Sequence, residues 1–514
     1  MHRLVVAVAS VAFAAPCAPA APPGDGSFAA ARLAPPDATA LVRVRDAIGL
    51  RATGSVLPAQ AALLRLADQR VLGQAWDGLA GALGLPADQL VDRLLGTDAT
   101  YLERSGADGA EWTLVARSDQ ALQDLFLARL SPAVGAGGRS AYPAFRLVSA
   151  WRPPYMLIGP ADRPALFEQA LARFDAAEPP ASLAGSPDLA AALAWDAAPV
   201  ELALRHPAGV GGMTVVSARP SGGELRLRHR SRFDRPPIHV APGAPADTGL
   251  VQALQDDCLA VLAMNPWRGP LEEGEPLDAL LVEGGADESL RATMAARQLV
   301  VVGSRTLDGS RIQVPAAVLA VEVRDHVLAR QQWDAWARRF AEAMSRRAGM
   351  PPAVPPQAAG QPRRAGINAA LRAAFSDHPF AREADLAWDG VTGANGSWQL
   401  VGSDPGLLAR VRDRIASAAR TPDPGGADEV GVLHGRMLGS MLRSWVPDAA
   451  LFAPTAPEPF AQAVGLLAEV AAAAPTVRWR AWSRPGGAVE SDVVIVLPGP
   501  DAVAAPPAAT GSDR

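Results

Sequence analysis

The chain has 514 residues, enough for two to four domains, and its 49% hydrophobic and 20% charged residues are typical of a globular protein. All 48 basic residues are arginine, which we attribute to genomic base-composition bias. The net charge of −5 argues against a nucleic-acid-binding protein, so no nucleic acid is expected among the partners.

The first 20 residues have the three parts of a secretory signal peptide. Met1–Arg3 is a short positive start, Leu4–Ala15 is an apolar run, and Ala18 and Ala20 form a small-residue cleavage site. The run is shorter than the roughly 20 residues that span a bilayer. We therefore predict residues 1–20 as a signal peptide, with the protein located in the periplasm or outside the cell. A retained N-terminal anchor, or a cut after Ala14, is the alternative.

The rest of the chain is predicted to be soluble, with no transmembrane span after the signal, because charged residues, Pro or Gly interrupt every apolar stretch. Cleavage after Ala20 removes Cys17 and leaves Cys258 as a lone cysteine. Cys258 opens the apolar run 259–264, which is typical of a buried residue rather than a reactive thiol.

Two halves of the chain carry five corresponding segments in the same order, which indicates an internal duplication. They are rich in paired strands, strand-to-helix transitions and Gly-containing turns. The pairs are 37–44 with 257–264, 111–130 with 316–344, 145–148 with 384–388, 155–174 with 398–415, and 213–233 with 477–497. The sequence predicts a first α+β module over residues 32–235 and a second over 250–499.

Proline-rich stretches support these boundaries. Residues 235–250 are predicted to link the modules, residues 349–366 to form an insertion in the second, and residues 500–514 to form a disordered tail. Adjacent strands, with Asn395-Gly396 as a hairpin signal, favour antiparallel or mixed sheets. The predicted fold class is α+β: two tandem copies of one module, with helices packed on one face of the sheets.

The sequence contains no recognisable catalytic, cofactor-binding or metal-binding motif. It lacks Gly-x-Ser-x-Gly, His-Glu-x-x-His and phosphate-binding glycine loops. Paired acids such as Asp256-Asp257, Glu272-Glu273 and Asp385 with Asp389 lack the alternation of a Ca²⁺ loop and are expected in solvated loops. His206 and His434 fall at equivalent strand positions, for which we favour a structural role.

One strand carries a stripe of arginines. Residues 225–233 alternate strictly, so Arg226, Arg228, Arg230 and Arg232 share one face of a strand. A weaker stripe of Arg478, Arg480 and Arg484 lies at the equivalent end of the second module, with Trp482 on the same face. Such a face is either an ordinary solvated sheet surface or a binding surface for an anionic envelope component or another protein.

The segment 33–44, LAPPDATALVRV, resembles the opening of a domain family of unknown function found in exported bacterial proteins. Those proteins begin with Leu-x-Pro-x-Asp-Thr before an apolar strand, and here Thr39 stands one place later. The resemblance covers mainly the first module and implies a fold and an exported location, with no activity.

Taken together, these patterns favour an exported, non-enzymatic protein that binds a ligand or partner in the bacterial envelope. Two alternatives stay open. One is a periplasmic carrier of an apolar ligand such as lipid, and the other is a hydrolase whose site is assembled from distant segments.

Overall fold

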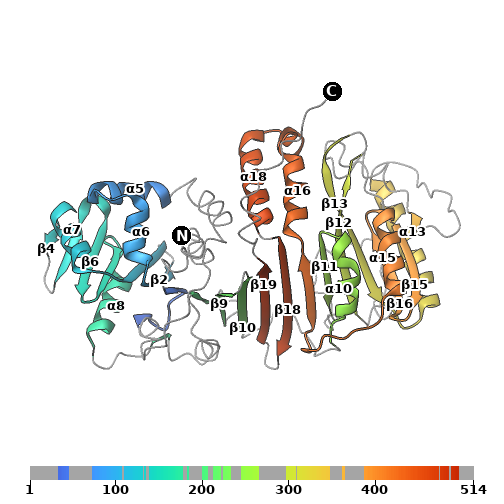
Figure 1. Ribbon diagram of the computed structural model, residues 1–514, viewed down its shortest axis with the longest axis horizontal. Coiled ribbons are helices and arrows are strands. Elements are labelled where there is room, and N and C mark those ends of the chain that lie inside the picture. The colour runs from blue at the N-terminus through green and yellow to red at the C-terminus, as the bar shows by residue number, and fades with distance from the viewer. Residues whose placement is uncertain are drawn as a thin grey trace. The chain divides into compact units, whose positions relative to one another are not determined.

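The computed structural model forms two compact units, unit 1 with residues 1–237 and 486–514 and unit 2 with residues 238–485 (Figure 1). The residues that it describes are 33–45, 72–106, 109–130, 132–134, 138–176, 182–183, 200–205, 212–221, 224–232, 245–264, 297–307, 310–347, 362–364, 387–473, 475–484 and 488–496. The predicted signal peptide, the tail 500–514, His206 and most of the insertion 349–366 lie outside them.

Unit 1 is built on an antiparallel sheet, with every recorded strand pair antiparallel. In the order of hydrogen-bonded neighbours its strands are β4 (Ala133–Val134), β5 (Arg139–Tyr142), β6 (Leu147–Arg152), β7 (Tyr155–Pro160), β3 (Gly109–Arg117), β2 (Asp98–Gly106), β1 (Ala40–Arg45), β8 (Val200–Arg205), β9 (Met213–Ser221), β10 (Glu224–Arg232) and β19 (Ala488–Val496).

Helices cover both faces of this sheet. They are α5 (Leu72–Leu83), α6 (Ala87–Leu95), α7 (Gln120–Leu130) and α8 (Ala165–Asp175), with a 3-10 turn η1 at Pro143–Phe145. Successive residues of β3 are buried on opposite sides: Val115 packs with Phe167 of α8, whereas Leu114 packs in a cluster with Leu94 of α6 and Phe126 of α7. Each face therefore has its own apolar core.

The strand pairs of unit 2 are antiparallel as well. Its strands, in the order of hydrogen-bonded neighbours, are β14 (Arg363–Arg364), β15 (Ala387–Gly393), β16 (Gly396–Gly402), β13 (Gln313–Glu322), β12 (Gln298–Thr306), β11 (Ala260–Met264), β17 (Glu429–Leu433) and β18 (Thr476–Arg484). The expected hairpin joins β15 to β16, where Gly396 has a φ of 109° that suits glycine.

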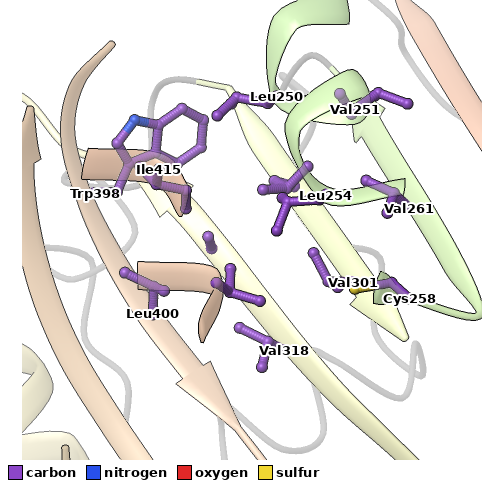
Figure 2. Packing of buried hydrophobic residues seen from close by; sticks show 14 of the residues in the cluster. Leu250, Val251, Leu254, Cys258, Val261, Val301, Val318, Trp398, Leu400 and Ile415 are labelled. Carbon is purple, nitrogen blue, oxygen red and sulfur yellow. The ribbon is translucent and has the colours of Figure 1, made fainter. Parts of the chain in front are cut away.

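The helices of unit 2 are α10 (Thr248–Leu254), α13 (His326–Arg347), α15 (Pro405–Ser417), α16 (Gly435–Trp445), α17 (Ala449–Phe452) and α18 (Pro457–Ala473), with a 3-10 turn η3 at Gln255–Asp257. Figure 2 shows the main core, where Leu250 and Leu254 of α10 and Ile415 of α15 lie with Val318 and Leu400 of the sheet. Helix α13 contacts β15 and β16, and Trp388 of β15 donates through Nε1 to Asp334 Oδ1 of α13 at 2.7 Å.

The strand order of unit 2 follows the same path as that of unit 1, because β15–β16–β13–β12–β11–β17–β18 matches β6–β7–β3–β2–β1–β8–β9. One connection differs. Seven residues, 206–212, join β8 to β9, whereas residues 434–475 join β17 to β18 and contain α16, α17 and α18. Helices α16 and α18 approach closely at Gly439, where a Cβ would lie 2.7 Å from the Ala468 carbonyl oxygen.

The predicted α+β class, two tandem modules with helices packed on one face of their sheets, is wrong, although the strands do pair antiparallel as one of the expected arrangements. Extended antiparallel sheets dominate, and strand residues outnumber helical ones in the described ranges. In unit 1 helices lie on both faces, and α16 and α18 pack mainly on each other. The units are also not consecutive in sequence, because β19 pairs with β10 in unit 1. The physical reason is that strands such as β3 bury apolar side chains on both faces of the sheet, so helices are needed to cover both faces.

Candidate functional site

The predicted arginine stripe lies on β10, which is hydrogen-bonded to β9 on one side and to β19 on the other. We call these three strands the ribbon. The strict alternation of residues 224–232 gives β10 two chemically different faces, because neighbouring side chains of a strand point to opposite sides. Arg226, Arg228, Arg230 and Arg232 share one face, as predicted from the sequence.

Acidic residues accompany these arginines. Arg226 pairs with Glu224 of its own strand at 3.0 Å, and two further arginines pair across to β19: Arg228 with Asp492 at 3.4 Å and Arg230 with Glu490 at 3.6 Å. The arginine face is therefore a ladder of both charges rather than a purely cationic stripe.

Most of this charged ladder is open to solvent, whereas the pair of Arg230 and Glu490 is partly buried. The side chains of Arg226 and Arg228 are 62% and 52% exposed, Asp492 is 47% exposed, and Arg232 is exposed at the end of the strand opposite Ala488. Exposed ion pairs of this kind contribute little to stability, on the order of 0–1 kcal/mol each. The charges are consequently available to another molecule at small loss to the fold.

The opposite face of the ribbon holds a hydrogen-bonded histidine that the sequence did not single out. His229 Nδ1 lies 3.1 Å from Ser491 Oγ, and His229 Nε2 lies 2.7 Å from Ser231 Oγ, which in turn lies 2.6 Å from Thr214 Oγ1. A neutral imidazole donates through one nitrogen and accepts through the other, so both hydroxyl partners suit it. Ser231 is 3% exposed, which makes this row part of the sheet's internal bonding.

Three other residues considered from the sequence, Cys258, His434 and Arg480, have contacts that indicate structural roles. Cys258 is buried beside Val261 and Val301 (Figure 2), and burial raises the pKa of its thiol to about 11, so the unreactive protonated form dominates at neutral pH. His434 follows β17 and is the N-cap residue of α16. Arg480 pairs with the buried Asp423 at 3.1 Å.

Of the acids expected in solvated loops, Asp256 is exposed in η3, Asp389 lies in strand β15, and Asp257 and Asp389 pair with arginines. Asp257 meets Arg414 at 2.8 Å with both side chains about half exposed, and Asp389 meets Arg412 at 2.9 Å. Glu272, Glu273 and Asp385 lie outside the described residues. Across the described ranges, no three His, Cys, Asp or Glu side chains gather as a metal site.

Unit 2 also contains a buried ionic network that was not predicted from the sequence. The guanidinium of Arg297, with 6% of its side chain exposed, donates to Asp247 Oδ2 at 2.8 Å, to Glu322 at 2.8 and 3.0 Å, and to the Asn395 carbonyl at 3.0 Å. It also lies 5.4 Å from the ring centroid of Trp398. Its members come from four separate segments, so no local pattern indicated it.

Asp247 connects this network to the start of a helix. Its Oδ1 accepts from the backbone N–H groups of Gly249 and Leu250, which caps α10, and from that of Thr421. The network therefore fixes the ends of several elements around one buried cation, which is a structural role.

Comparison of the chain with protein-family models, with curated proteins and with solved structures finds no match. Each helix in the described part of the chain is too short or too polar to cross a bilayer.

Proposed function

We propose that the chain is an exported, non-enzymatic protein of the bacterial envelope that binds a protein partner through the charged face of the ribbon. The leader 1–20 supports export, and the charged ladder supports binding, with Arg226, Arg228 and Arg232 exposed and Arg230, Glu224 and Glu490 partly exposed. The single observation that carries the proposal is this ladder, whose exposed members are mainly arginines.

The mixed charge favours a protein over a polyanion. A uniform polyanion laid along β10 meets the carboxylates of Asp492 and Glu490 as well as the arginines, and like charges in contact weaken binding. A protein surface with alternating charges avoids this repulsion, and exposed arginines are frequent anchors of protein interfaces. The ladder therefore fits a partner that also carries both signs of charge.

Site-specific photo-crosslinking in the envelope of the native host tests the proposal. A photoreactive residue in place of Arg226 is expected to form one dominant protein adduct that weakens with added salt, since exposed charges are screened. The same residue in place of Arg410, exposed on α15, is the matched control and should not form that adduct.

Charge exchange separates binding from sheet structure. With the crosslinker at position 226, Arg228→Glu should remove the adduct, because it reverses a charge of the ladder. The double variant R228E/D492R restores an ion pair across the strands but inverts its direction, so the adduct should stay absent. Recovery of the adduct in the double variant, or equal adducts at positions 226 and 410, would contradict the proposal.

A further inference from the structure

Helix α13 has one face firmly fixed to unit 2. Ala329, Trp333 and Trp336 are at most 1% exposed, and the two tryptophan rings meet edge to face with centroids 5.2 Å apart. Asp334 accepts the hydrogen bond from Trp388. The helix has 22 residues, so it is roughly 33 Å long at 1.5 Å per residue, and these contacts hold the opposite face of its first half outward.

The outward face combines exposed apolar and basic side chains. Val327 and Leu328 are 58% and 46% exposed, which places them among the few large hydrophobic residues exposed in the described ranges. Four exposed arginines follow on the same helix, against one exposed acid, Glu342: they are Arg330, Arg338, Arg339 and Arg346. At 3.6 residues per turn, the apolar pair, the four arginines and Glu342 occupy the same half of the helix circumference, where the arginines outnumber the acid.

The corresponding helix of unit 1 lacks this character. Helix α7 follows β3 as α13 follows β13, but it has 11 residues, and its exposed charged residues, Asp124 and Arg129, are of opposite sign. The long basic face is thus a feature of α13 rather than of the shared strand path. Arg338 donates through Nε to the Asp334 backbone carbonyl, a neutral acceptor that leaves the positive charge in place.

We propose that α13 docks on an anionic membrane surface, with Val327 and Leu328 in the interfacial region and the arginines against lipid phosphates. A helix that lies on a membrane needs a basic face together with apolar side chains, whereas a free anion or a polyanion needs only the charge. The exposed apolar pair therefore selects a membrane among anionic partners. This inference uses residues outside the ribbon and is independent of the partner proposed there.

Vesicle co-sedimentation of the full chain tests the inference. The probes are vesicles of phosphatidylcholine alone and of phosphatidylcholine with about one third phosphatidylglycerol. The wild-type chain is expected to prefer the anionic vesicles and to lose this preference at high salt. R338Q/R339Q should bind them about 30-fold more weakly, given about one kcal/mol for each arginine near the surface. V327S/L328S should bind about tenfold more weakly.

The control removes the same charges from another helix. Arg436 and Arg443 are exposed on α16, so R436Q/R443Q changes the net charge equally and should keep wild-type binding. The leader is identical in every variant, so its own affinity for lipid cancels in the comparison. Equal binding to both kinds of vesicle, or equal loss in the α16 and α13 variants, would overturn the inference. Circular dichroism of each variant verifies that the fold is intact.

Discussion

Arg297 is a buried cation in unit 2 that binds residues from several separate segments. Its guanidinium is almost fully removed from solvent, and two carboxylates and a backbone carbonyl satisfy its donors. A buried charge with partners is tolerated, but removal of one partner leaves the other charge in a medium that solvates it poorly.

The stability of the chain should therefore depend strongly on this side chain. Arg297→Ala leaves the buried carboxylate of Asp247 without its counter-ion, so the free energy of unfolding should fall by about 3–5 kcal/mol. Arg414→Ala, which removes a half-exposed partner of Asp257, should lower it by less than about 1 kcal/mol. Urea denaturation of both variants measures the difference, and similar losses would contradict the role given to burial.

Glu322 makes part of this stability dependent on pH. Burial by itself raises the pKa of Glu322, but the hydrogen bonds and charge of Arg297 outweigh burial and hold the pKa below its ordinary value of 4.5. A lowered pKa in the folded state stabilises the protein above the unfolded value, and this contribution is lost as the pH falls through the folded value.

The stability gap between the wild-type chain and Glu322→Gln should accordingly be largest near neutral pH and shrink below about pH 4.5. Urea denaturation of both forms at neutral pH and at about pH 3 measures the gap. A gap of the same size at both pH values would show that Glu322 acts by shape and not by charge.

Packing between β17 and β18 depends on a glycine. The indole of Trp479 lies over Gly431, where a Cβ would be 2.1 Å from the ring, and its Nε1 donates to Glu429 Oε1 at 2.7 Å. The acceptor, Glu429, is on β17, the strand that also contains Gly431, so this hydrogen bond holds the ring over the glycine. No such crowding exists at Gly465 in α18, where a Cβ would meet nothing within 4 Å.

The same substitution should therefore have opposite effects at the two sites. Gly431→Ala should lower the free energy of unfolding by about 1–3 kcal/mol because Trp479 must move. Gly465→Ala should raise it by about 0.5–1 kcal/mol because alanine favours the helix. Thermal and urea unfolding of the two variants checks both signs. A Gly431→Ala variant as stable as the wild-type chain would contradict the close packing of Trp479 on Gly431.

At the scale of the whole molecule, local patterns predicted elements better than their assembly. The Gly-rich turn before residue 224 and the alternation after it led to β9 and β10, because turn chemistry and a period of two are local properties. The segment 111–130, matched in the sequence as a strand followed by a helix, was confirmed as β3 and α7. Helices α16 to α18 were not predicted, because the segment that contains them has no counterpart among the five matched segments of the two halves.

The candidate site was predictable only in part, for a related reason. The alternation of β10 placed the four arginines on one face, but the acids opposite them come from β19, more than 250 residues further along the chain. The register between two strands far apart in the chain is set by the tertiary fold, so no local pattern in the sequence indicates it. The same holds for Arg297, whose partners at 247, 322 and 395 meet only in the folded unit.

The pairing of β10 with β19 has a consequence for biosynthesis. A ribosome completes residues 224–232 more than 250 residues before it reaches 488–496, so one edge of β10 lacks its hydrogen-bonding partner throughout that part of synthesis. Unpaired strand edges are sites of aggregation, and contacts so distant in sequence slow folding. Shielding of β10 during synthesis is therefore a requirement that this topology places on the cell.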